Sequence, residues 1–126
     1  MTRERLKVLI IDDDPDVRKI AHVSLTHLGR MDVVEASNAV EGVERAAREQ
    51  PDVILLDIMM PRTDGVATIA NLRREPATSS IPVIFLTARS AEDTQALLRR
   101  TGALGLLSKP FDPTTLADQL RSLLGA

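Results

Sequence analysis

Residues 53–61 of this chain have the sequence VILLDIMMP, which is the most informative stretch for the fold. The four apolar residues before Asp57 form a short β-prone run, which is typical of a strand buried on both faces. Residues 8–14, VLIIDDD, repeat the arrangement, because a second apolar run ends in three aspartates. In open α/β sheets the carboxyl ends of parallel strands form the ligand-binding edge. The two runs therefore predict several carboxylates around one point.

Such a cluster of acids has an electrostatic cost. Two like charges about 4 Å apart repel by about 4 kcal/mol at an effective dielectric constant of about 20. Asp12, Asp13 and Asp57 together therefore need a cation or a shared proton. Mg²⁺ takes oxygen ligands and uses one or two carboxylates together with waters and phosphate oxygens. Asp13, Asp57 and the backbone carbonyl of Met59 could supply half of that shell, so we expect a metal site with chemistry on Asp57.

Length and composition indicate one domain over residues 1–126. Charged residues make up 27% of the chain and hydrophobic residues 44%, an ordinary globular balance. The formal net charge of −2 argues against a broad nucleic-acid surface. The chain contains no cysteine, so disulfides and thiolate metal sites are excluded. It has no signal-peptide pattern and no apolar run near the roughly 20 residues that span a bilayer, which favours a cytoplasmic protein.

Short apolar runs alternate with helical patterns from end to end. The expected strands are residues 7–11, 32–35, 53–56, 82–86 and 103–107. Apolar residues at helical spacing predict a helix after each strand. The stripes of the first two helices are Val17, Ile20, Ala21, Ser24, Leu25 and Leu28, and then Val40, Val43 and Ala47.

This alternation predicts the α/β class, with a parallel sheet and five helices on its two faces. The doubly wound solution for five such units is the flavodoxin-like strand order 2-1-3-4-5. Strands 1 and 3 are then neighbours, which brings Asp12, Asp13 and Asp57 to one crevice. Asp14 before Pro15 is interpreted as the N-cap of the first helix, and Asp112 before Pro113 as that of the last.

Two further polar residues follow the fourth and fifth runs. The hydroxyl of Thr87 and the ammonium of Lys109 could hold the oxygens of a phosphoryl group at the same edge. In isolation, Thr87 is better interpreted as a turn or N-cap residue and Lys109 as a surface lysine. Gly65 is assigned to backbone geometry. His22 and His27 fall off the apolar stripe and are expected to be exposed and inactive.

Together these segments resemble the receiver domain of bacterial two-component response regulators, over essentially the whole chain. The matching segments are Asp12-Asp13, LDIMMP at 56–61 with Asp64-Gly65, Thr87-Ala88 and KPF at 109–111. Each is weak alone, but the set in this order is highly specific.

The resemblance implies roles for the residues of the crevice. Asp57 would accept a phosphoryl group from a sensor histidine kinase or a phosphotransfer protein. Mg²⁺ would be held by Asp12 through water and by Asp13, Asp57 and the Met59 carbonyl. Lys109 would pair with the phosphoryl oxygens, and Thr87 would move toward them. The Lys109-Pro110 bond is typically cis in receivers.

The implied function is a phosphorylation-activated signalling switch, not an enzyme beyond its own phosphorylation and dephosphorylation. The signal would pass through the face made by the fourth helix, the fifth strand and the fifth helix, which also allows a homodimer. The expected partner is a downstream output domain or protein, with no direct contact to nucleic acid or membrane. We expect a stand-alone regulator or a receiver excised from a longer protein.

The chain departs from the receiver pattern at three places. Leu106 stands where receivers usually carry Tyr or Phe, so we expect weaker or differently wired output coupling. Thr63 replaces a common methionine, for which only local repacking is expected. Met59 and Arg89 flank the path of the hydrolytic water in the family, and they predict slow dephosphorylation.

Two other functions compete with the switch. One is a Mg²⁺-dependent phosphohydrolase with Asp57 as a transient nucleophile, although no insertion is long enough to form a cap over a substrate. The other is a degenerate receiver that only binds proteins, which is disfavoured because every chemical position is intact.

Overall fold

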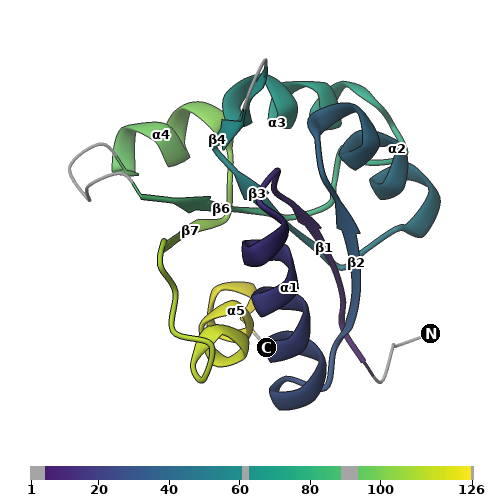
Figure 1. Cartoon of the computed structure of the whole chain (residues 1–126). Coiled ribbons are helices and arrows are strands. Elements are labelled where there is room, and N and C mark those ends of the chain that lie inside the picture. The colour runs from purple at the N-terminus through teal and green to yellow at the C-terminus, as the bar shows by residue number, and fades with distance from the viewer. Residues whose placement is uncertain (1–4, 61–62, 89–93, 126) are drawn as a thin grey trace.

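The computed structural model describes residues 5–60, 63–88 and 94–125. It contains a five-stranded parallel sheet with helices on both faces (Figure 1). The strand order is β2-β1-β3-β6-β7, which is the expected order 2-1-3-4-5 for the five long strands. These strands are β1 (Lys7–Ile11), β2 (Asp32–Ala36), β3 (Val53–Asp57), β6 (Val83–Thr87) and β7 (Gly105–Ser108). The α/β class and the doubly wound topology are confirmed.

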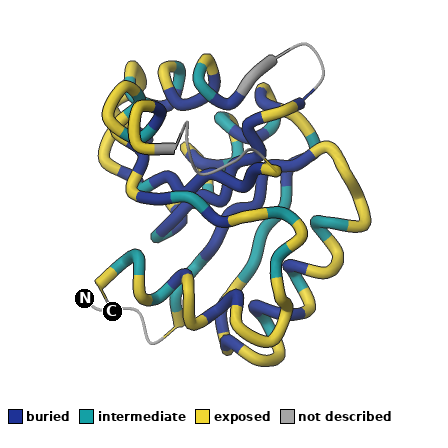
Figure 2. Tube along the Cα trace, turned by 90° about the vertical axis from the view of Figure 1, so that its left-hand side faces the viewer, coloured by how far each residue is buried: buried dark blue, intermediate teal, exposed yellow. Residues whose placement is uncertain are grey.

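The central strands are buried over their whole length, as their apolar sequences predict. Every residue of β3 and β6 is buried, and both strands pair with parallel neighbours. Figure 2 shows this buried centre, with most exposed residues on the surrounding helices and loops. The last residues of these two strands are Asp57 and Thr87, so the ladder itself positions both side chains at the sheet edge.

The helices divide between the two faces of the sheet. On one face, α1 (Pro15–Val23), the π-helical segment η1 (Ser24–Leu28) and α5 (Leu116–Leu124) pack against alternate strand residues. On the other face lie α2 (Ala39–Glu49), α3 (Gly65–Arg74) and α4 (Thr94–Thr101). Neighbouring residues such as Ile10 and Ile11 therefore belong to different cores, because successive side chains of a strand point to opposite faces. Among the described residues, no helix combines the length and the apolar character that crossing a bilayer requires.

The two predicted helix caps have different outcomes. Asp14 caps α1 as expected, since its side chain accepts a hydrogen bond from the Asp16 N–H at 2.9 Å. The prediction for the last helix was wrong, because α5 begins at Leu116 with Thr115 as its N-cap. Asp112 instead accepts hydrogen bonds from the backbone and hydroxyl of Thr114, at 2.9 and 2.6 Å. Its side chain closes the turn before the helix.

Two of the predicted apolar stripes were partly wrong. Ile20 and Leu28 are 47% and 61% exposed, although Ala21 and Leu25 are fully buried as predicted. The segment after Val23 is π-helical, which adds a residue to the turn and accounts for the direction of Leu28 but not for that of Ile20 before it. In α2 the buried face consists of Ala39, Gly42 and Ala46, and the predicted Val40 is 71% exposed.

The segment after β3 contains a small hairpin that the sequence analysis did not predict. β4 (Met59–Met60) pairs antiparallel with β5 (Thr63–Asp64), directly before α3. The amide of Gly65 donates to the Ile58 carbonyl at 2.8 Å. A Cβ at Gly65 would lie only 2.8 Å from the Ile58 Cα and 3.2 Å from the Asp57 carbonyl oxygen. Gly65 therefore permits the close packing of the α3 start against the residues that follow Asp57.

The π-helical segment gives a direct test of the corrected stripe. We expect Leu25→Ala to lower the free energy of unfolding by about 2–5 kcal/mol, because it leaves a cavity in the core. Leu28→Ala, the same change three residues later, should alter the free energy of unfolding by no more than about 0.5 kcal/mol, since Leu28 is 61% exposed. Urea denaturation of both variants measures the difference, and equal losses would contradict the burial described above.

Candidate functional site

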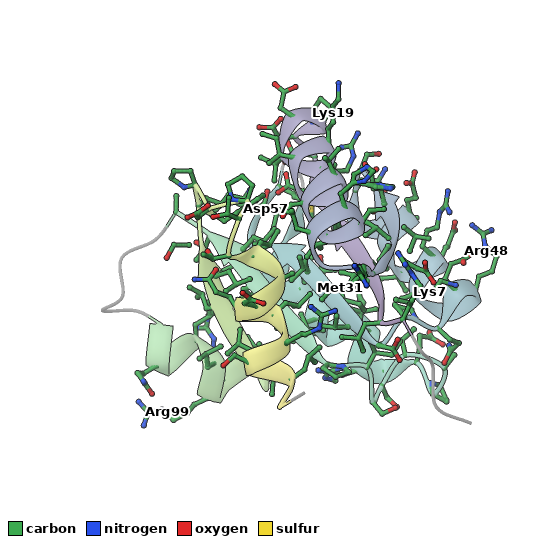
Figure 3. All side chains as sticks on the ribbon, turned by 90° about the horizontal axis from the view of Figure 1, so that it is seen from below. Lys7, Lys19, Met31, Arg48, Asp57 and Arg99 are labelled. Atoms are coloured by element: carbon green, nitrogen blue, oxygen red, sulfur yellow. The ribbon has the colours of Figure 1, made fainter. Side chains whose placement is uncertain are left out.

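The side chain of Asp57 is the centre of the candidate site. It is delivered by the last position of β3 and is 4% exposed. Its Oδ1 accepts a hydrogen bond from the Met59 N–H at 3.0 Å. In Figure 3, Asp57 lies between helix α1 and the segment leading to α5, and Lys7 and Arg48 lie at the far side. The strand thus holds a buried carboxylate at the edge of the sheet, with one oxygen already oriented by the backbone.

Two further carboxylates converge on Asp57, as predicted. Asp12 is fully buried just after β1, and Asp13 beside it is exposed. One carboxylate oxygen from each of Asp12, Asp13 and Asp57 lies within 4.8 Å of the others. This spacing follows from the pairing of β1 with β3, whose carboxyl ends are adjacent.

Lys109, directly after β7, contacts residues at the ends of β1, β3 and β6. Its Nζ lies 2.7 Å from Asp12 Oδ2 and 3.3 Å from Asp57 Oδ2. Its backbone N–H donates to the Thr87 carbonyl at 2.8 Å, directly after β7. The Lys109-Pro110 peptide bond is cis, as the family resemblance implied. The ammonium is thus placed between the two buried acids.

The surroundings of Asp57 change its acidity. Burial, together with the negative charge of Asp12, raises the pKa of Asp57 to about 6, although the Met59 N–H and Lys109 act in the opposite direction. Burial alone would lower the pKa of Lys109, but its hydrogen bonds and charge interactions with Asp12 and Asp57 raise it above the ordinary value. One ammonium therefore does not compensate fully for the clustered carboxylates.

This donor set fits a hard divalent cation. Three carboxylates within 4.8 Å supply the oxygen ligands that Mg²⁺ takes, and the exposed Asp13 gives access from solvent. Burial and the negative charge of Asp12 raise the pKa of Asp57, so the ionised carboxylate is disfavoured in the folded protein without a cation. A cation at this point would remove that cost.

The remaining predicted residues lie around the same edge or outside the described part. Thr87 is buried at the end of β6, and Leu106 in β7 is partly buried against the core cluster that contains Phe85. Met59 is 64% exposed beside Asp57. Arg89 lies outside the described residues, and so do the side chains of Thr63 and Asp64.

One set of contacts at the site was not predicted from the sequence. Arg18 donates from Nη1 to the Asp12 carbonyl at 2.8 Å, and its Nε lies 3.1 Å from Glu35 Oε1. His22 was expected to be exposed, but it is partly buried, and its Nδ1 lies 2.6 Å from Glu35 Oε2. His27 is exposed as expected. No sequence signal links Glu35 to α1, since the contact depends on the pairing of β2 with β1.

Known proteins resemble this chain over nearly its whole length. The family model "Response regulator receiver domain" matches residues 8–121. The chain is 37% identical over 121 residues to the response regulator Rre1 of Synechocystis sp., covering 96% of this chain and 52% of that protein. It is 36% identical to protein PilH of Pseudomonas aeruginosa, covering 94% of this chain and 97% of PilH.

The fold of this chain is also similar to that of solved structures. The chemotaxis protein CheY4 of Vibrio cholerae superposes with a TM-score of 0.86 at 28% identity, covering 94% of this chain and 98% of CheY4. The chain spans about half the length of the first curated relatives, 52% of Rre1 and 48% of the DNA-binding regulator RpaA of Synechocystis sp.. The similarity thus covers nearly all of this chain but only part of those longer regulators.

The pKa of Asp57 makes stability depend on pH. Because burial raises the folded-state pKa from 3.8 to about 6, the folded protein binds this proton more tightly than the unfolded chain. We expect the metal-free protein to lose about 1–3 kcal/mol of stability as pH rises from 4 to 7 through this group. Asp57→Asn should raise the free energy of unfolding at pH 7 and remove most of this dependence. The exposed Asp118→Asn serves as the control, and an identical pH dependence in Asp57→Asn and wild type would contradict the assignment.

Proposed function

Because the chain belongs to the response regulator receiver domains of two-component signalling, we propose that it is a switch activated by phosphorylation of Asp57. The observation that carries the proposal is the placement of a buried carboxylate beside Lys109, Asp12 and Asp13 at the edge of the sheet. We extend the receiver assignment to residues 1–126 as one domain.

The reaction is a transfer of a phosphoryl group to a carboxylate oxygen of Asp57. The carboxylate attacks phosphorus, and the bond to the donor breaks with its electron pair leaving on the donor. The Met59 N–H holds Asp57 Oδ1, which leaves Oδ2 on the Lys109 side as the candidate nucleophile. Lys109 would then pair with the incoming phosphoryl oxygens.

Mg²⁺ is the cofactor that this donor set fits. Asp13, Asp57 and the Met59 carbonyl would hold it directly, with Asp12 acting through water. When bound, the cation supplies neutralisation of the charge on the phosphoryl oxygens. Asp12 has a second task, because its Oδ2 holds the Lys109 ammonium 3.3 Å from Asp57.

The output would leave the site through Thr87 and the neighbouring strand. Thr87 pairs with Ser108 of β7, and its carbonyl accepts from Lys109. A phosphoryl group adds charge of about −1.5 to −2 and strong acceptor oxygens, to which a nearby hydroxyl can move. We propose that α4, β7 and α5 carry the signal to an output domain or protein, and that Leu106 replaces an aromatic readout by packing. A sensor histidine kinase or phosphotransfer protein would supply the phosphoryl group.

Intact-mass spectrometry after incubation with acetyl phosphate tests the proposed function. We expect one phosphoryl adduct that requires Mg²⁺, disappears with chelator and is absent in Asp57→Asn. Asp118→Asn, an exposed carboxylate on α5, should keep the adduct. Steady release of phosphate without an adduct would favour a phosphohydrolase. If both the adduct and phosphate release are absent, the result would indicate a domain that only binds proteins.

The exposed side chain of Met59 predicts a long-lived phosphoryl group. A long apolar side chain beside Asp57 hinders the hydrolytic water, and Met59 is 64% exposed there. We expect Met59→Asn to speed loss of the phosphoryl group about threefold, a change of about 0.7 kcal/mol in the barrier. Leu104→Asn, at an exposed leucine before β7, should leave the half-life unchanged. An unchanged half-life in Met59→Asn would rule out the steric effect.

A further inference from the structure

Arg18 connects helix α1 to the backbone of the acidic cluster. It lies in the second turn of α1, and its side chain is 19% exposed. Its Nη1 donates to the carbonyl oxygen of Asp12 at 2.8 Å. A guanidinium is planar and keeps its donors in a fixed fork, so one fixed contact orients the others. Arg18 therefore holds the peptide between Asp12 and Asp13 from its carbonyl side.

Glu35 in turn fixes the guanidinium. Its Oε1 lies 3.1 Å from Arg18 Nε, and its Oε2 lies 2.6 Å from His22 Nδ1. Both carboxylate oxygens are thus engaged by side chains of α1. Glu35 pairs with Ile10 across the sheet, in the strand next to the one that leads to Asp12. The Arg18 side chain is consequently held between a strand and a helix in one orientation.

The backbone N–H and the side chain of Asp12 are also fixed by hydrogen bonds. Its N–H donates to the Ala36 carbonyl at 3.1 Å, and its Oδ1 accepts from the Asp14 N–H at 2.9 Å. The contact from Arg18 adds the carbonyl, so the backbone is restrained on both sides of the residue. Rotation of the Asp12–Asp13 peptide would move both acids relative to Asp57. Groups that orient metal ligands typically change metal affinity by about 10–100-fold when mutated.

We propose that Arg18 is a positioning residue for the divalent cation site, which it orders by fixing the Asp12–Asp13 peptide. Glu35 and His22 support it by fixing the guanidinium. This inference rests on the proposed function, in which Asp12, Asp13 and Asp57 hold Mg²⁺.

The sign of the effect separates positioning from simple electrostatics. Arg18→Gln removes a positive charge near the carboxylates, which by charge alone would tighten the binding of a cation. Loss of the contact that positions the Asp12–Asp13 peptide would instead weaken the binding of the cation. Lys19→Gln removes the same charge from the next residue of α1, and Figure 3 shows Lys19 at the outer tip of the molecule. This variant measures the charge effect without the contact.

The experiment is a titration of wild type, Arg18→Gln, Arg18→Lys and Lys19→Gln with Mg²⁺, followed by amide NMR shifts. We expect binding about tenfold weaker in Arg18→Gln and intermediate in Arg18→Lys, which keeps the charge but loses the fork. Lys19→Gln should bind as tightly as wild type or more tightly. In the metal-free proteins, the Asp13 amide resonance should move in Arg18→Gln and stay in Lys19→Gln, because it reports the hydrogen bond at the Asp12 carbonyl.

Two results would overturn parts of the account separately. Mg²⁺ binding by Arg18→Gln that is as tight as in wild type, or tighter, would overturn the role of Arg18. Wild type that shows no saturable Mg²⁺ binding would overturn the proposed function instead. If Arg18→Gln does not fold, Arg18→Lys and Glu35→Gln replace it, and unchanged Mg²⁺ affinity in both would overturn the role.

Discussion

The ion pairs of Lys109 with Asp12 and Asp57 are the interaction on which the site depends. One ammonium lies 2.7 Å from one buried carboxylate and 3.3 Å from another. Three strands, β1, β3 and β7, must end at the same place for these contacts to form. Their order in the sheet therefore serves the site as well as the core. A change in register of one residue would turn each side chain to the other face of the sheet.

The buried acidic site lowers the stability of the metal-free folded protein. Burial and the charge of Asp12 raise the pKa of Asp57, so the ionised carboxylate destabilises the metal-free protein near neutral pH. The backbone reduces this cost in part, because the Met59 N–H donates to Asp57 and the Asp14 N–H donates to Asp12. A cluster of carboxylates that the fold stabilises only in part suits the proposed site, which would take a cation and then a phosphoryl group.

The sequence was sufficient to predict the five long strands and the acidic residues at the ends of two of them. Apolar runs predicted all five long strands within two residues at each end. The signal was clearest for β3 and β6, which are buried throughout. The convergence of Asp12, Asp13, Asp57 and Lys109 followed from the parallel order. The exposure of Leu28 was mispredicted, since a π-helical turn leaves no clear periodic signal. The start of α5 was also missed, because an aspartate followed by proline can cap a turn as well as a helix.

Contacts between distant segments could not be predicted from the sequence. Arg18, Glu35 and His22 each look like solvated polar residues, and only the packing of α1 beside β2 brings them together. The short hairpin of β4 and β5 has two residues in each strand, too few for an alternating pattern. Both features adjoin Asp12 or Asp57, so the less predictable parts of the fold lie at the site itself.

Carbon-13 NMR titration of the Asp57 side-chain carboxyl, with and without Mg²⁺, tests directly whether the acids around Asp57 hold a cation. We expect a pKa near 6 in the metal-free protein and a value well below it when Mg²⁺ is present, because a bound cation favours the carboxylate. The same pKa under both conditions would mean that the acids gathered around Asp57 do not hold a cation, and would contradict the account.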